Sequence, residues 1–241
     1  MTKIFGLLVV ALLSACAHQT QFEPRDPLEP VNRAIFKFND TADRYVLRPL
    51  AVGYDTVTPE IVQMGVSNFF ANLFYPVTVV NQYAQGKWLD GTSDLGRFVV
   101  NSTVGLAGFV DVAKHWGLPA HREDFGQTLG SWGVGEGWFL VIPFLGPSTN
   151  RDLVGMLVDA PFSPVYYVDE RDPILALTAL NIVQIRAGLL GADGILNEQD
   201  DRYAFLRSAY LQQRQSAVRD GAPAPMDDFD DLLDEDFEDS L

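Results

Sequence analysis

The feature that most constrains this chain is a run of 26 residues, Ile61–Gly86, that contains no charged side chain. A transmembrane helix needs about 20 apolar residues, but this run holds several amides and hydroxyls, and Pro76 is expected to divide it into two helices. Four of its polar side chains form two pairs with a spacing of four residues, which stacks them along the first helix. The pairs are Gln63 with Ser67 and Asn68 with Asn72.

Two interpretations of the run Ile61–Gly86 remain open. The run can be a buried helical hairpin whose amides are satisfied by hydrogen bonds, and composition alone favours this. It can instead be a helix pair that contacts lipid on one side and lines a polar cavity on the other. The residues themselves do not decide between the two.

A second stretch, Phe125–Asn150, contains only one charged residue. Gly133, Gly135 and Gly137 interrupt any regular helix just before the apolar run Trp138–Leu145. The aromatic and β-branched residues of that run predict an extended hairpin. No lysine follows the glycines in the pattern of a phosphate-binding loop, so we do not expect them to bind a nucleotide.

The first residues have the pattern of a secretory signal peptide. Lys3 precedes an apolar segment, Ile4–Leu13, and the small residues Ser14 and Ala15 mark a cleavage site. Cys16 follows directly. This order resembles the bacterial lipoprotein box, in which the cysteine thiol receives a diacylglycerol before cleavage. Residues 1–15 are therefore expected to be removed, leaving Cys16 as the first residue of the mature chain.

A lipidated Cys16 would by itself hold the protein at a membrane, without any contribution from the fold to membrane binding. Two or three acyl chains anchor firmly, because each buried methylene contributes about 0.8 kcal/mol. Ala17 follows Cys16, whereas aspartate at that position is the usual signal for retention in the inner membrane. The predicted location is thus the periplasmic leaflet of the outer membrane.

Composition sets limits on the fold and on the partners. Cys16 is the only cysteine, so no disulfide can form within the chain. The formal net charge is −15, and nine of the acidic residues lie in Met226–Leu241. This balance argues against nucleic acid as a partner, because phosphates require a basic face. We expect a tether at 16–25, one folded domain at 26–219 and a disordered acidic tail at 220–241.

Apolar residues at spacings of three and four predict several helices. The first runs through Val31–Tyr45 and is expected to end at Pro49. Another helix is expected at Trp88–Val104, with Leu95 and Val99 on one side.

Two further helices are expected later in the chain. One begins at Asp172-Pro173 and is apolar nearly all round until Arg186, which predicts a place at the centre of the fold. The last runs from Asp200 to Val218 and is expected to bury a stripe that includes Tyr203. Together these segments predict a mainly α protein.

The sequence offers little for catalysis or metal binding. His115 and His121 lack the spacing and the carboxylate partner of a metal site, so no metal and no cofactor are expected. A lipid hydrolase would need an exposed nucleophile, but Ser131 lies in the wrong frame for a Gly-x-Ser-x-Gly elbow. We therefore do not expect an enzyme.

With these residues laid out, the chain resembles the MlaA (VacJ) family of outer-membrane lipoproteins. Several short motifs occur in the family's order over roughly Asp26–Gln215, which makes the likeness more specific than any single motif. The acidic tail is outside it. The motifs are Asp26-Pro27-Leu28-Glu29 with Asn32-Arg33, Ser67-Asn68-Phe69 with Asn72-Leu73, Gly108-Phe109-Val110-Asp111, Phe125-Gly126-Gln127-Thr128-Leu129-Gly130, and Pro143-Phe144.

This resemblance implies a single-domain ring of amphipathic helices with a short extended hairpin, immersed in one membrane leaflet. An amphipathic channel through the ring would let phospholipids that have strayed into the outer leaflet reach a soluble periplasmic carrier, MlaC. Trimeric porins would be the usual companions. The resemblance also shifts the interpretation of both uncharged stretches toward lipid contact.

The resemblance and the residue pattern together name candidate site residues. Phe38 and Asn39 match a motif position near the start of the fold and are gating candidates. The glycine-rich segment would border the channel, and its glycines would let it flex. The candidate channel or lipid contacts are Gln63, Ser67, Asn68, Asn72, Gly133, Gly135, Gly137, Trp138, Phe139, Pro143 and Phe144.

A rival hypothesis stays open beside lipid transport. The protein can be a structural envelope lipoprotein that scaffolds porins and carries no lipid. That hypothesis predicts that no phospholipid co-purifies with the mature chain and that none passes to a carrier.

Overall fold

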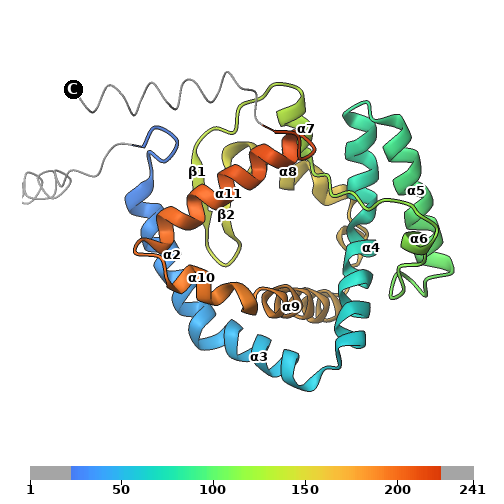
Figure 1. Cartoon of the computed structure of the whole chain (residues 1–241), viewed down its shortest axis with the longest axis horizontal. Helices are drawn as coiled ribbons and strands as arrows, with labels where there is room; N and C mark the ends of the chain where they lie inside the picture. The colour runs from blue at the N-terminus through green and yellow to red at the C-terminus, as the bar shows by residue number, and fades with distance from the viewer. Residues whose placement is uncertain (1–22, 224–241) are drawn as a thin grey trace, which may run out of the picture.

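The computed structural model describes residues 23–223. Helices and one two-stranded antiparallel sheet follow one another around a ring, and the ribbon leaves the middle of the ring open (Figure 1). This confirms the predicted mainly α ring with a short hairpin. The signal peptide 1–15, Cys16, most of the tether and the tail from residue 224 lie outside the described residues.

The first wall of the ring is one long helical path. It consists of α2 (Glu29–Ala42), a π-helical turn (Asp43–Leu47) and α3 (Arg48–Val57). The predicted end at Pro49 is wrong. In the π-helical turn the N–H of Arg48 bonds to the carbonyl of Asp43, five residues back. Pro49 therefore lies directly after a turn whose backbone hydrogen bonds already differ from those of a regular α-helix. Its missing N–H does not end the helix there.

The second wall is α4 (Glu60–Ala84), which continues through Pro76. The predicted division into two helices is therefore wrong. An interior proline costs about 3 kcal/mol, but Tyr75, Thr78 and Val79 are buried beside it. The helix contacts α5, α7 and α9, and the bonds from Asn72 and Gln82 to α5 hold it before and after the proline.

The elements α5 (Trp88–Thr103) and α6 (Val112–His115) lie outside the ring, beside α4 (Figure 1). The chain then returns to the ring through α7 (Phe125–Ser131). The predicted hairpin is confirmed: β1 (Phe139–Ile142) pairs antiparallel with β2 (Gly146–Thr149).

The hairpin closes the ring. β1 packs on α2 at the start of the fold, and β2 leads into α8 (Asn150–Asp159), which packs on α7. α7 in turn contacts α4. The core cluster lies at this closure and consists of Phe139, Val141, Tyr203 and Leu211, with Ile35, Phe36 and Tyr210 packed against it.

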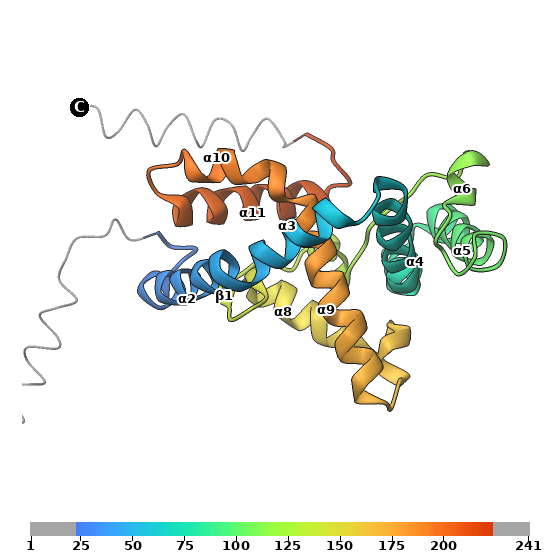
Figure 2. The ribbon, with the colours of Figure 1, turned by 90° about the horizontal axis from the view of Figure 1, so that it is seen from below.

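The last elements give the ring two different faces. After short 3-10 turns at Ala160–Phe162 and Pro164–Tyr167 come α9 (Arg171–Gly188), another 3-10 turn (Leu190–Ala192), α10 (Asp193–Asn197) and α11 (Arg202–Val218). Figure 2 shows α10 and α11 on one face, while α9 crosses the plane of the ring and projects from the other.

The predicted central place of α9 is wrong, because Ala187 is its only buried residue. Among the described helices, none alone has the length and hydropathy of a membrane span. The pair Arg171–Gly188 and Leu190–Asn197, bent by 42°, passes that test only in combination.

Candidate functional site

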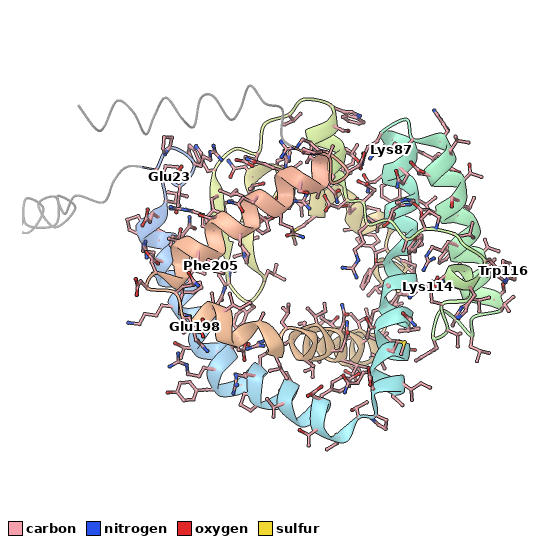
Figure 3. The ribbon with its side chains drawn as sticks, in the orientation of Figure 1. Glu23, Lys87, Lys114, Trp116, Glu198 and Phe205 are labelled. Carbon is pink, nitrogen blue, oxygen red and sulfur yellow. The ribbon has the colours of Figure 1, made fainter. Side chains whose placement is uncertain are left out.

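The distribution of polar and apolar side chains is the reverse of that in a water-soluble domain. Among the seven largest side chains that are almost completely buried in the described part of the chain, only Phe139 is apolar. Large apolar side chains are instead exposed in many elements, as in Leu89 at 87% and Val57 at 78%. Trp116, at the outer rim, points away from the ring (Figure 3). A surface of this kind marks contact with lipid or protein.

Helix α5 shows the reversal most clearly. Its side toward α4 carries Asp94, Arg97 and Asn101, all buried. Its exposed side carries Leu95 and Val99. The inner side of α5 is held by hydrogen bonds, and its outer side exposes apolar side chains.

Asp94 is the centre of the inner side of α5, with a side chain that is completely buried. It accepts hydrogen bonds from Tyr75 Oη at 2.8 Å and from Gln82 Nε2 at 3.2 Å. Its carboxylate also lies 3.0 Å from Nδ1 of His121. Burial raises the pKa of the Tyr75 hydroxyl, and the neighbouring carboxylate adds to the shift. His121, which sequence analysis left without a role, thus joins α5 to α4.

One turn further along, Arg97 pairs with Asp111 and donates to the carbonyl of Leu118 at 2.7 Å. Asn101 donates to Asp111 at 3.0 Å and accepts from the N–H of Ala113 at 2.9 Å. Burial alone would raise the pKa of Asp111, but the bonds from Asn101 and Arg97 hold it below its ordinary value. These bonds fix α6 to α5.

The four polar candidates on α4 do not form one exposed surface. Gln63 donates to the carbonyls of Asp55 at 3.2 Å and Thr58 at 2.9 Å, at the corner between α3 and α4. Ser67 is exposed and Asn68 is half-buried. Contact of these three with lipid stays a prediction.

Asn72 differs from the other candidates on α4. It is buried, and its amide donates to Ser102 Oγ at 2.8 Å. Gly108 packs so closely on it, with φ +95°, that a Cβ there would lie 2.4 Å from the Asn72 side chain. Asn72 therefore serves the packing of α4 on its neighbours and does not line an exposed path.

The structure brings the gating candidates together with the tip of the hairpin. Asn39 donates to the carbonyl of Ile142 at 3.0 Å and accepts from the N–H of Phe144 at 2.9 Å. The rings of Phe38 and Phe144 meet edge to face, 5.1 Å apart. Phe144 has φ +64° and is 78% exposed. Four of the predicted residues, including Pro143 in the turn, thus form one unit that joins α2 to the hairpin tip.

The base of the hairpin is held by residues that sequence analysis did not assign to the site. Asn32 accepts from the N–H of Val141 at 2.9 Å and donates to the carbonyl of Phe139 at 3.0 Å. Its amide also donates to Asp26 at 2.8 Å. Asp26 in turn accepts from Arg207 at 2.9 Å and from the hydroxyl of Tyr203. The Asp26–Asn32 motif was visible in the sequence, but its partners 107 or more residues away were not.

The glycine-rich segment is an exposed loop beside the hairpin. Gly133 has φ +88° and Gly137 has φ +71°, a region that favours glycine. Gly135 has open space where a Cβ would lie. Trp138 is 52% exposed, but Phe139 is 1% exposed and packs on Tyr203 and Tyr210. Phe139 is therefore a core residue, because the alternation of β1 turns it inward, and it is not a lipid contact.

Acidic and basic groups join α7, α8 and α11 behind this loop. Arg214 donates to both oxygens of Asp124, at 2.7 and 2.8 Å, and to Asp152 at 2.7 Å. Arg214, near the end of α11, therefore points inward and joins the three helices. Within residues 23–223 no group of three side chains has the arrangement of a metal site.

Comparison with known proteins adds to this geometry. The family model described as MlaA lipoprotein matches residues 24–217. The chain belongs to the MlaA lipoprotein family.

Named relatives and a solved structure agree with this assignment. The intermembrane phospholipid transport system lipoprotein MlaA of Escherichia coli K12 is 35% identical over 243 residues, covering 96% of each chain. An uncharacterized protein of Rickettsia bellii is 36% identical over 199 residues, covering 82% of this chain and 78% of the relative. A structure described as "Structural basis for maintenance of bacterial outer membrane lipid asymmetry" matches with a TM-score of 0.72. It is 34% identical and covers 80% of this chain and 98% of the other.

Proposed function

We propose that this MlaA-family lipoprotein removes mislocalised phospholipids from the outer leaflet of the outer membrane and delivers them for return transport. The observation that carries the proposal is the reversed burial: polar groups hold the ring together from within, and apolar side chains face outward. The relatives named as intermembrane phospholipid transport lipoproteins support it. A lipid path needs no covalent chemistry, and we propose no enzymatic activity.

The apolar exterior fits immersion in a single leaflet. Lipid chains can cover exposed residues such as Leu89 and Val57, and no single described helix spans a whole bilayer. In Figure 3, side chains reach toward the middle of the ring without filling it in that view. A headgroup passing through the middle would avoid the cost of carrying charge across hydrocarbon. This arrangement lets the ring act as a passage between a leaflet and water.

The partners follow from the family and belong to the same proposal. A trimeric porin would hold the ring in the outer membrane, and a soluble carrier, MlaC, would receive the lipid in the periplasm. The lipid anchor on Cys16 would place the domain at the periplasmic leaflet.

The anchor can be tested by replacing Cys16 with alanine. We expect the variant to lose its lipid and to fail in restoring the outer leaflet of a deletion strain, because the domain is no longer held at its membrane. The measurement is labelled-palmitate incorporation together with the amount of phospholipid in the outer leaflet. Full rescue by an unlabelled, soluble variant would contradict the anchoring proposal.

The deletion strain itself tests the function. We expect phospholipid to accumulate in its outer leaflet and the wild-type gene to reverse this. An unchanged outer leaflet in the deletion strain would contradict the proposed function and favour the rival structural role, in which the protein scaffolds porins without moving lipid.

Flexing of the glycine-rich loop can be tested separately with Gly135→Val. Nothing lies within 4 Å of a Cβ at this position, so the variant is expected to fold with an unchanged melting temperature. Valine lacks the backbone freedom that glycine has, and we expect slower removal of outer-leaflet phospholipid. A folded variant that works at the wild-type rate would show that the loop need not flex at Gly135.

A further inference from the structure

One stripe of exposed apolar side chains follows the edge of the ring along α2, the π-helical turn and α3. Residues seven apart lie two turns along a helix, so Val31, Phe38 and Tyr45 share one side of this path. A π-helical turn holds about one residue more than a regular turn, so beyond it the stripe continues one position later. The members of this apolar stripe are Val31 at 55%, Phe38 at 49%, Tyr45 at 74%, Val46 at 60%, Leu50 at 55% and Val57 at 78% exposed.

A basic stripe runs beside the apolar stripe and consists of Lys37, Arg44 and Arg48. Lys37 and Arg44 each come one residue before a member of the apolar stripe, which places them about 100° from it around the helix. Arg48 comes two residues before Leu50 and therefore lies on nearly the opposite side. All three basic residues are exposed, with 61% of the Arg44 side chain and 51% of the Arg48 side chain open to the surroundings.

Ion pairs show which way the basic stripe faces. Arg48 donates to Asp193 of α10 at 2.9 Å, and Arg202 of α11 donates to Asp40 of α2 at 2.7 Å. The basic stripe therefore lies on the side of α10 and α11, and the apolar stripe turns toward the other face of the ring. Figure 2 shows that α2 and α3 run along the ring and do not cross its plane. A helix that lies flat, with an apolar side and flanking lysine and arginine, is typical of the boundary between membrane and water.

The acidic neighbours do not neutralise this edge of the ring. Asp40 is shared between Arg44, at 3.7 Å, and Arg202, at 2.7 Å. Asp193 is shared between two arginines in the same way. Within residues 23–223 Lys37 forms no ion pair. Five basic side chains thus meet three acidic ones, in a chain with a net charge of −15. They are Lys37, Arg44, Arg48, Arg186 and Arg202 with Asp40, Asp43 and Asp193.

We propose that the edge formed by α2 and α3 binds the anionic headgroups of the leaflet in which the protein sits. Lys37, Arg44 and Arg48 contact the lipid phosphates, and the apolar stripe enters the acyl region below them. The long stems of lysine and arginine let the charged ends reach the headgroups while their methylenes stay among apolar groups. This inference rests on the membrane location in the proposed function and adds a second membrane contact besides Cys16.

The test measures binding to vesicles by the chain with Cys16→Ala, in which no acyl anchor contributes. The protein is diluted from detergent into vesicles of phosphatidylcholine alone or of equal parts phosphatidylcholine and phosphatidylglycerol, and the fraction that floats with the vesicles is measured. A net charge of −15 is repelled by an anionic surface, so a preference for phosphatidylglycerol requires a local basic surface. We expect about tenfold tighter binding to the anionic vesicles, and high salt should remove the difference.

The variant Lys37→Gln with Arg44→Gln and Arg48→Gln removes the basic stripe. We expect it to bind the anionic vesicles about tenfold more weakly, since one cation at an anionic surface contributes about fivefold and acidic neighbours share two of the three. Its binding to phosphatidylcholine alone should not change. Circular dichroism of the purified variant checks its folding.

The control variant is Lys114→Gln with Arg122→Gln and Arg171→Gln, which makes the same change in net charge at exposed positions of other elements. It should stay within about twofold of the parent chain on both kinds of vesicle. An equal loss in both triple variants, or equal binding of the parent chain to both kinds of vesicle, would overturn the inference. Neither result touches the proposed removal of lipid, which the deletion strain tests separately.

A second measurement covers the case in which the triple variant does not fold. Cys16 is the only cysteine, so Val46→Cys in the Cys16→Ala chain provides a single labelling site in the apolar stripe. A polarity-sensitive fluorophore there should shift to the blue when anionic vesicles are added, and the same label at Gln213→Cys, exposed on α11, should not. No shift at position 46, or an equal shift at position 213, would overturn the proposed contact.

Discussion

Asn32→Asp is expected to lower the free energy of unfolding by about 3 to 5 kcal/mol, through the exchange of a single NH₂ for oxygen. The Asn32 amide donates to Asp26 and to the carbonyl of Phe139, both buried. In the variant one carboxylate oxygen replaces the NH₂ group and faces both of these acceptors, and a second carboxylate lies beside Asp26 without a donor between the two. The contacts between α2, β1 and α11 should open first, because Asn32 joins α2 to β1 and to Asp26, which accepts from Tyr203 and Arg207 of α11.

Thermal unfolding in detergent would check the effect, and we expect the melting temperature to fall by roughly 10 °C for a chain of this size. Asn197→Asp, at an exposed position of α10, makes the same chemical change and should shift the melting temperature little. If both variants melt like wild type, the bonds at Asn32 do not hold the hairpin to α2.

Asp94→Leu is the second change with a large expected effect. A leucine in a protein interior normally stabilises it, but Asp94 is completely buried among donors from Tyr75 and Gln82 and next to His121. Removing the carboxylate leaves these groups without an acceptor, at about 1 to 3 kcal/mol for each unsatisfied group. We expect a loss of about 3 kcal/mol or more and faster amide hydrogen exchange in α5 and α6.

The neighbouring residue provides the reverse control. Leu95→Asp places a charge at an exposed position of the same helix. In detergent it should leave the melting temperature close to that of wild type, while in cells it should weaken the contact of α5 with its apolar surroundings. If Asp94→Leu is as stable as wild type and Leu95→Asp unfolds, α5 does not bury its polar side and expose its apolar side.

Sequence reasoning predicted the helices and the hairpin because their signals are local. Gly133, Gly137 and the aromatic residues after them act within a few residues, and the hairpin followed. The prolines misled for the same reason. Pro49 and Pro76 are strong local breakers, but a π-helical turn accommodates the first and tertiary packing holds the second.

The sides of the helices could not be assigned because the usual rule assumes water outside. Asp94, Arg97 and Asn101 recur at helical spacing, and in water that pattern predicts an exposed side. Here they are buried, and Leu95 and Val99 are exposed. The same assumption placed α9 at the centre of the fold. The family resemblance suggested lipid around the ring, but it could not show which side of each helix meets it.

Contacts between distant segments account for the rest of what was missed. Phe38 and Asn39 were candidates, and so were Pro143 and Phe144, but nothing in the sequence shows that Asn39 bonds to the turn that carries Phe144. The local motif of Asp26 and Asn32 contributed only to the family resemblance. Its role in holding the hairpin depends on partners from Phe139 to Arg207.

The reversed exterior also limits how such a protein can be delivered. Under the proposed function, the folded domain would cross an aqueous compartment before it reaches a membrane, with side chains such as Leu89, Val57 and Ile61 facing solvent. Apolar patches of this extent drive self-association in water. We therefore expect the newly made chain to need an escort that shields it in transit, and the yield of monomer to depend on how soon it reaches its bilayer.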